Sequence, residues 1–239
     1  MRIRQVLSVL AVFAFAATLS ATPILIDHFT DPFGSGNIDN PGTFPFGPLA
    51  ATALGNTHTI TINRSTPNNG FHTTATIASS IFVFSQDSLV DGSASIVWDN
   101  NSLGLRASGN GTTGANGFDL SKGGLELGMR VLVGSDQLAN TFTITLTDWS
   151  GNTATFVGSG VANGANPTAL FEIPWSGFSL VGPFDITMVK SIAANLNPVQ
   201  AGDMAFDLLG TYESPEPVAC ALIGAGLFTI GLLRKLTTR

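Results

Sequence analysis

The residues most suited to catalysis in this sequence are the histidines His28, His58 and His72 and the glutamates Glu126 and Glu172. Histidine serves as a general base or a metal ligand, and two carboxyl groups that flank one glycosidic bond can hydrolyse it. None of these residues lies in a known catalytic spacing, since the sequence contains no G-x-S-x-G, H-E-x-x-H, phosphate-loop or D-x-D-x-D-G pattern. We therefore expect no enzymatic activity and no cofactor, with a secreted hydrolase as an alternative.

Aromatic residues offer a second kind of chemistry, because an exposed ring packs on the apolar face of a sugar. Trp149 lies in the predicted turn 148–152, where a large apolar ring has no obvious core to enter. Trp98 ends an alternating segment and Trp175 follows Pro174, and core packing is the better interpretation for both. The sequence therefore predicts Trp149 as a glycan-binding residue, and the alternative is a ring folded over the end of the domain.

Strict alternation of apolar and polar residues marks two segments as strands with one buried face. Residues 57–63 read T-H-T-I-T-I-N and residues 141–148 read T-F-T-I-T-L-T-D. His58 shares the side of Ile60 and Ile62, which favours a packed, hydrogen-bonded histidine over a catalytic one. Each of these segments is expected to turn its threonines to solvent.

Nine further segments predict strands, and clusters of Gly, Asn, Asp and Ser separate them. No part of residues 22–213 shows a helical period. The chain is therefore expected to be all-β, a two-sheet antiparallel β-sandwich of one domain over residues 22–213. Residues 31–54, rich in Gly and Pro, are expected to form a long loop over one end. The nine segments are 24–29, 71–77, 80–84, 93–98, 125–133, 153–157, 169–173, 186–192 and 204–211.

The N-terminus has the pattern of a secretory signal peptide, assigned to residues 1–21. Arg2 and Arg4 precede an apolar stretch over residues 6–19, and the small residues Ser20 and Ala21 follow. Cleavage after Ser20 and cleavage after Ala21 both remain open. The signal implies the Sec export machinery as a partner.

The C-terminus carries an apolar run without charge over residues 218–233, followed by the basic residues Arg234, Lys235 and Arg239. As a helix this run is about 24 Å long, a little less than the hydrocarbon core of about 30 Å. Its glycines and its lack of a polar stripe favour a transmembrane helix over a buried core helix. The basic end is expected to stay cytoplasmic and to retain the chain, with the body across the membrane.

Pro215, Glu216 and Pro217, followed by the apolar run and the basic end, resemble the PEP-CTERM sorting signal over residues 214–239. The resemblance implies an inner-membrane-anchored precursor with its body in the periplasm of an envelope-bearing bacterium. It also implies an exosortase that removes the tail, after which the protein reaches the cell surface or the extracellular matrix. The basic cluster is thinner than the usual arginine run, which bears on the efficiency of retention.

Charge and cysteine content exclude several classes of partner and site. The chain has sixteen acidic and ten basic residues, but five of the basic ones lie in the two terminal segments, so the body is strongly acidic. Such a surface repels phosphate backbones, and nucleic acid is not expected as a partner. The only cysteine, Cys220, lies in the apolar run, so the body has neither a disulfide nor a Cys-ligated metal.

Three short segments, 24–29, 117–120 and 204–208, resemble the strand edges of galactose-binding-like jelly rolls, the fold of many carbohydrate-binding modules. The resemblance implies a structural Ca²⁺ site that joins the first and last strands. Asp27 and Asp207 occupy suitable positions for it, because carboxylates bind hard cations. The alternative is a pair of ordinary solvated charges.

Together these patterns predict an exported, non-catalytic envelope or matrix protein that associates with exopolysaccharide. The alternative is a carbohydrate-binding module with a defined glycan site, which an aromatic-lined groove would favour. Two carboxyl groups facing each other across a cleft would favour the hydrolase.

Overall fold

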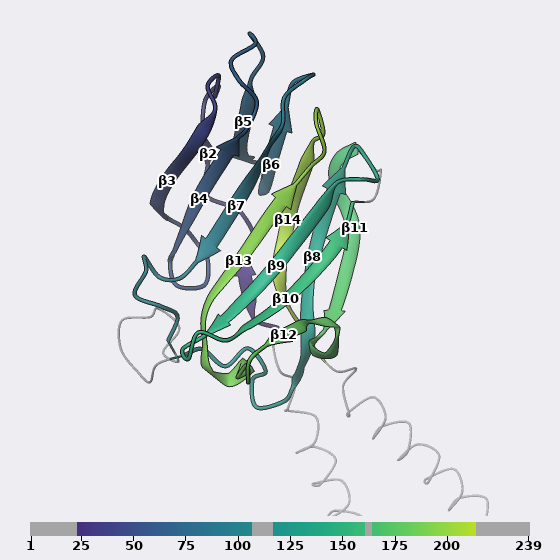
Figure 1. Cartoon of the computed structure of the whole chain (residues 1–239). Coiled ribbons are helices and arrows are strands. Elements are labelled where there is room, and N and C mark those ends of the chain that lie inside the picture. The colour runs from purple at the N-terminus through teal and green to yellow at the C-terminus, as the bar shows by residue number, and fades with distance from the viewer. Residues whose placement is uncertain (1–22, 107–116, 161–163, 214–239) are drawn as a thin grey trace, which may run out of the picture. The chain divides into compact units, whose positions relative to one another are not determined.

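The computed structural model describes residues 23–106, 117–160 and 164–213 (Figure 1). Residues Ile24–Tyr212 form one compact unit. This unit contains its own hydrophobic core, which is the property of a segment that can fold by itself. Among the described residues, no helix has the length and apolar character needed to cross a membrane. The predicted signal peptide, PEP-CTERM motif, membrane segment and basic end all lie outside the described ranges and stay predictions.

The predicted two-sheet antiparallel sandwich is confirmed, and within the described residues each sheet has seven strands. Sheet A has the order β11-β8-β14-β6-β5-β2, with β1 paired to β14. Its strands are β1 Leu25–Asp27, β2 Phe33–Gly34, β5 Thr73–Ala78, β6 Ile81–Gln86, β8 Glu126–Ser135, β11 Gly164–Pro174 and β14 Met204–Glu213. Sheet B has the order β12-β10-β9-β13-β7-β4-β3. Its strands are β3 Gly42–Ala50, β4 Thr57–Arg64, β7 Gly92–Trp98, β9 Thr141–Asp148, β10 Thr153–Ser159, β12 Ser179–Val181 and β13 Val189–Asn197.

Alternation in the sequence corresponds directly to burial in the strands. In β4 and β9 every second residue is buried, and the threonines between them are half-exposed, as predicted. Large buried side chains from both sheets fill the core, among them Trp98, Phe82, Phe84, Phe142 and Phe206. The core assignment of Trp98 is therefore confirmed, since its side chain is fully buried.

The expectation of a long loop over residues 31–54 is wrong. This segment forms β2 and β3, and Phe44 and Phe46 of β3 pack against the core. β3 is the last strand of sheet B and pairs only with β4, and an edge strand tolerates Pro45 and Pro48 because one of its sides makes no ladder. The Gly and Pro content that suggested a loop is therefore also compatible with an edge strand.

All eleven expected strands are present, but the strand predicted over residues 186–192 begins differently. Its first residues form a single 3-10 turn, η2 Ile186–Met188, and β13 starts at Val189. The Asp185 side chain caps this turn by accepting a hydrogen bond from the Thr187 backbone N–H. A second 3-10 turn, η1 Trp175–Gly177, follows β11.

The loops gather at two opposite ends of the sandwich (Figure 1). We call one the Arg64 end, where β4 stops and β9 starts. The other is the Trp149 end, at the bottom in Figure 1, where the β9–β10 turn, η1, β12 and η2 lie. The candidate functional site is at the Trp149 end.

Candidate functional site

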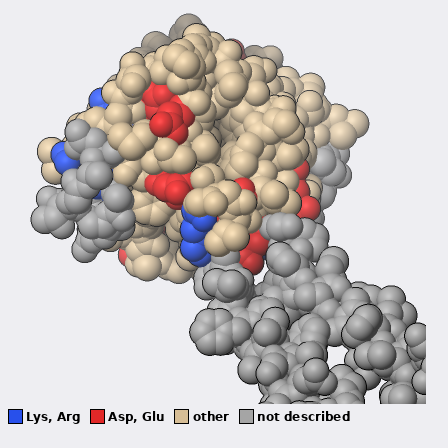
Figure 2. Space-filling model, turned by 90° about the horizontal axis from the view of Figure 1, so that it is seen from below, with Lys and Arg blue, Asp and Glu red and all other residues tan. Residues whose placement is uncertain are grey.

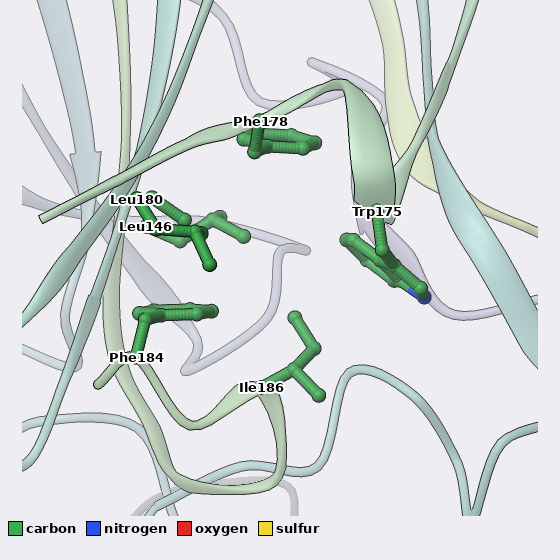
Figure 3. A pocket seen from close by; sticks show the side chains of 7 residues that line it. Leu146, Trp175, Phe178, Leu180, Phe184 and Ile186 are labelled. Atoms are coloured by element: carbon green, nitrogen blue, oxygen red, sulfur yellow. The ribbon is translucent and has the colours of Figure 1, made fainter. Parts of the chain in front are cut away.

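An aromatic-lined hollow of about 190 Å³ lies at the Trp149 end, and we call it the end hollow (Figure 3). Its lining comes from four separate parts of the chain: β9, β10, η1 with β12, and the segment leading into η2. Figure 3 shows the rings of Trp175, Phe178 and Phe184 and the side chains of Leu180 and Ile186 arranged around an open space. Leu146 and Ala154 complete the lining.

The segment between β11 and β13 builds most of the hollow. β12 adds a short edge strand beside β10, with Leu180 opposite Ala154. The rings of Trp175 and Phe178 lie 6.1 Å apart at 38°, which fixes their relative position. The Trp175 indole N–H donates to the backbone carbonyl of Glu126 at 2.8 Å, which ties η1 to β8.

Asp148 holds the opposite rim in place. Its carboxylate accepts hydrogen bonds from the backbone N–H groups of Ser150 (2.8 Å), Asn152 (2.9 Å) and Asp185 (3.1 Å), and from the Asn152 amide (2.9 Å). Burial raises the pKa of the Asp148 carboxyl, but these hydrogen bonds outweigh burial and leave the pKa below its ordinary value. Because Asp185 lies between Phe184 and Ile186, Asp148 positions two lining residues.

The chemistry of the lining is apolar. None of the seven lining side chains has a free hydrogen-bonding group, because the Trp175 indole N–H already has a partner. Polar groups stand at the rim, where the exposed Asp185 and Thr187 alternate with Phe184 and Ile186. The hollow can therefore hold a flat, partly apolar ring by its faces while the rim contacts its hydroxyl groups.

Charge around this end is sparse. Figure 2 looks at it from below and shows Asp and Glu in small patches, and few Lys and Arg, in a mostly uncharged surface. A charged ligand therefore finds few ion-pair partners at this end.

The predicted glycan-binding residue Trp149 lies at the same end but outside the lining of the hollow. Its ring is half-buried, with Arg106 at 5.4 Å and Lys190 at 5.6 Å from the ring centre. The indole N–H donates to the Leu105 carbonyl at 3.3 Å. Gly104 lies against the ring so closely that a Cβ there would come within 2.7 Å of it. Contacts with the protein therefore cover much of the Trp149 ring. Its contact with a glycan stays a prediction.

The structure gives Asp27 and Asp207, the predicted calcium ligands, different neighbours. Asp27 is buried and accepts hydrogen bonds from Trp98 Nε1 (2.8 Å) and the Phe29 N–H (2.7 Å), and its Oδ2 lies 3.0 Å from His58 Nδ1. It thus links β1 of sheet A to β4 and β7 of sheet B, and the prediction of a packed, hydrogen-bonded His58 is confirmed.

Asp207 points from β14 toward His28, with 3.3 Å between Oδ1 and Nδ1. Among the described residues, no group of three or more His, Cys, Asp or Glu side chains is arranged to hold a metal ion. The third histidine, His72, contacts Asp39.

Glu126 and Glu172, the residues of the hydrolase alternative, do not line the hollow. Glu172 pairs with Arg130 across the β11–β8 ladder, and Glu126 lies four residues before Arg130. Four strand residues span about 13 Å, more than the carboxyl separations of about 5–9.5 Å that glycosidases use. Burial and the nearby charge of Glu172 raise the pKa of Tyr212.

Sequence reasoning missed Phe178, Leu180, Phe184 and Ile186 and assigned Trp175 to the core. Trp175 does pack against the core, but it is only half-buried and also lines the hollow. One signal was present: residues 174–184 read P-W-S-G-F-S-L-V-G-P-F, with large apolar residues among Gly, Pro and Ser. Such a composition is typical of a loop that carries a binding site.

No family model matches the chain, and no curated protein matches it. Among solved structures, the family 11 carbohydrate-binding module of a Clostridium thermocellum cellulosomal cellulase is 12% identical. That match covers 82% of this chain and 96% of the module, with a TM-score of 0.40. A family 30 carbohydrate-binding module is 15% identical over 81% of this chain and 98% of its own, with a TM-score of 0.41. An agarase is 8% identical over 73% of this chain and 25% of its own, with a TM-score of 0.39. Likenesses this distant say nothing about a ligand of this chain.

Proposed function

We propose that this protein is an exported, non-catalytic glycan-binding protein of a bacterial envelope or extracellular matrix, and that the end hollow holds a sugar ring. The observation that carries the proposal is the aromatic hollow itself, open at one end of the sandwich and lined by Trp175, Phe178 and Phe184. Sugars combine apolar ring faces with hydroxyl edges, and aromatic walls with a polar rim match both.

Size and charge narrow the ligand class. A volume of about 190 Å³ is below the roughly 300–1,000 Å³ of sites for drug-sized ligands, so the hollow suits one ring of a polymer or its terminal unit. The body is acidic, and Asp185 stands on the rim, so a neutral sugar is favoured over an anionic one.

A binding role is favoured over hydrolysis because Glu126 and Glu172 lie away from the hollow. Two carboxylates lie close to the lining along the chain: Asp148 is buried under four hydrogen bonds that hold the rim, and the exposed Asp185 accepts hydrogen bonds from the Thr187 N–H and hydroxyl. Among the described residues we therefore assign no catalytic pair.

Export and sorting belong to the same proposal. The signal peptide would deliver the body to the periplasm, and the PEP-CTERM-like tail would present Pro215, Glu216 and Pro217 to an exosortase. Replacing these three residues with alanine is expected to leave an uncut precursor in the inner membrane, as seen by fractionation and mass spectrometry. A mature mass equal to that of the unchanged protein would show that the tail is a plain anchor or is cut elsewhere.

The glycan site is tested by calorimetric titration of residues 22–213 with oligosaccharides prepared from the host's own polysaccharide. Phe184→Ala removes one wall of the hollow and is expected to weaken binding at least tenfold. Phe184 is half-buried and packs against the core, so some loss of stability is also expected, and binding is measured at a temperature where the variant is still folded.

Phe71→Ala serves as the matched control, since Phe71 is 36% exposed and lies at the Arg64 end. It is expected to bind like the unchanged protein. Equal binding by the unchanged protein and Phe184→Ala would rule out the hollow, and no binding to any neutral oligosaccharide would reject the proposed function.

A further inference from the structure

The outer face of sheet B, on the side away from the core, carries almost only small uncharged side chains. Outward residues alternate with buried ones along β4, β7, β9, β10 and β13. The strand registers place these outward residues in rows that cross the sheet. One row runs through Val157, Thr143, Asn195, Ser95, Thr61 and Pro45.

The row beside it runs through Thr155, Thr145, Ala193, Val97 and Thr59. We call these two rows the threonine face. Neighbouring strands lie about 4.8 Å apart, and outward residues repeat about every 6.8 Å along a strand. A row over six strands is therefore about 24 Å long.

The polar groups of the first row are available to a ligand, whereas in the second row the Thr145 and Thr155 hydroxyls lie 3.5 Å apart and can bond to each other. Within the described part of the chain, the hydroxyls of Thr61, Ser95 and Thr143 and the amide of Asn195 make no hydrogen bond to protein groups. Each hydroxyl can donate one hydrogen bond and accept two, and the amide can donate two and accept two. The face thus offers regular rows of both donors and acceptors.

Composition narrows the class of partner. Neither row contains a charged residue, so an anionic polymer or a lipid headgroup gains no ion pair there. Neither row contains Trp, Tyr, Phe or Arg, the residues that anchor protein interfaces. By contrast, the outer face of sheet A carries Arg130, Glu172 and Asp207.

We infer that the threonine face binds an extended neutral polysaccharide that lies along the rows, across the strands. A neutral sugar chain presents hydroxyl groups without charge, so it matches the face in both hydrogen bonding and charge. The inference rests on the proposed function and adds a second surface: the hollow takes one ring, and the face takes a length of the polymer. Binding here is expected to be insensitive to salt, because no ion pairs form.

The test is affinity electrophoresis of residues 22–213 in gels that contain the host's polysaccharide, a neutral galactomannan or the anionic polygalacturonate. Thr143→Glu and Ser95→Lys place charges of opposite sign in the central row. Both are expected to weaken retardation by neutral polymer at least fivefold, because the charge loses its hydration when polymer covers it. The matched control is Thr76→Glu, an exposed threonine on β5 of sheet A, which is expected to leave retardation unchanged.

Two outcomes would overturn this inference. Unchanged retardation of Thr143→Glu at an unchanged melting temperature would show that polymer does not cover the face. Stronger retardation of the unchanged protein by polygalacturonate than by the neutral polymers would identify an anionic ligand. The hollow is judged separately by calorimetry with short oligosaccharides, in which Thr143→Glu is expected to bind like the unchanged protein and Phe184→Ala at least tenfold more weakly.

Discussion

At the Arg64 end of the sandwich, buried polar side chains tie the loops to one another, whereas at the Trp149 end aromatic rings surround a hollow. Arg64 is 2% exposed and donates hydrogen bonds to the carbonyls of Ile38, Thr66, Pro67 and Phe71. Its fifth partner is the Asn69 side chain. The buried guanidinium group is stable here because its N–H groups donate hydrogen bonds to five oxygen atoms of the surrounding loops.

Asn140 also connects loops at the Arg64 end. It is fully buried, donates to Ser135, Asp136 and the Asp203 carbonyl, and accepts from the Val199 N–H. The Trp149 end also has such a residue, Asp148, but its hydrogen bonds hold only the rim. Buried polar side chains can satisfy one another's hydrogen bonds and so close one end of the sandwich. Aromatic rings that line a hollow instead leave an apolar surface that a ligand can cover.

Arg64→Met is expected to cause the largest loss of stability, about 3–5 kcal/mol, because four backbone carbonyls lose a donor in a buried site. Urea unfolding of residues 22–213 measures the loss, and sugar binding by the folded fraction should be unchanged. Arg130→Met, at a half-buried arginine on the outer face of sheet A, is the matched control and should cost about 1 kcal/mol or less. Equal losses in the two variants would show that the Arg64 end is not held by this side chain.

Trp149→Ala is expected to cost about 2–3 kcal/mol, less than the 3–5 kcal/mol typical of a fully buried tryptophan, because the ring is half-buried. The ring packs on Gly104 and has Arg106 and Lys190 within cation–π distance, so its loss removes both packing and cation–π contacts. The melting temperature and the retardation on polysaccharide are measured together. Lost retardation at an unchanged melting temperature would instead assign this ring to the glycan.

Asp148→Asn is expected to lower stability at neutral pH and to make little difference in acid. The pKa of Asp148 is depressed in the folded state, so its contribution is present above the unfolded pKa of about 3.9 and is lost as pH falls through the folded pKa. Thermal melts of both proteins between pH 7 and pH 2.5 should therefore converge below about pH 4.

Asp119→Asn is the companion variant at the same end. Burial raises the pKa of Asp119, but hydrogen bonds from Ser121, Gly123 and Lys122 outweigh it, so the pKa is also lowered and the same convergence is expected. If the difference in stability between Asp148→Asn and the unchanged protein stayed constant over this pH range, the ionised Asp148 carboxylate would not be the group that stabilises the rim.

Leu180→Ala is expected to have the smallest effect on stability, about 0.5 kcal/mol or less, since the side chain is 60% exposed. Because Leu180 lines the hollow, oligosaccharide binding should still fall about two- to fivefold, as for a contact worth roughly 0.5–1 kcal/mol. Leu138→Ala, 71% exposed at the Arg64 end, is the matched control and should bind like the unchanged protein. Equal binding by the two variants would mean that the ligand does not reach β12.

The sequence by itself determined the residues whose environment depends on strand geometry alone. Alternation in β4 and β9 placed Ile60, Ile62 and Phe142 in the core and turned the threonines outward, because the strand pleat fixes a period of two within a few residues. His58 followed from the same rule, and its position on the core side predicted that it is packed.

Only the tertiary structure decided how distant segments meet. The Gly and Pro residues of β3 suggested a loop. The segment nevertheless forms a strand because it pairs with β4 at the edge of sheet B. The end hollow exists because residues as far apart in the chain as Leu146 and Ile186 converge there. Likewise, Asp27 accepts a hydrogen bond from Trp98, which lies 71 positions away in the sequence. Such contacts follow from the packing of one sheet on the other, and the local periodicity of the sequence does not predict them.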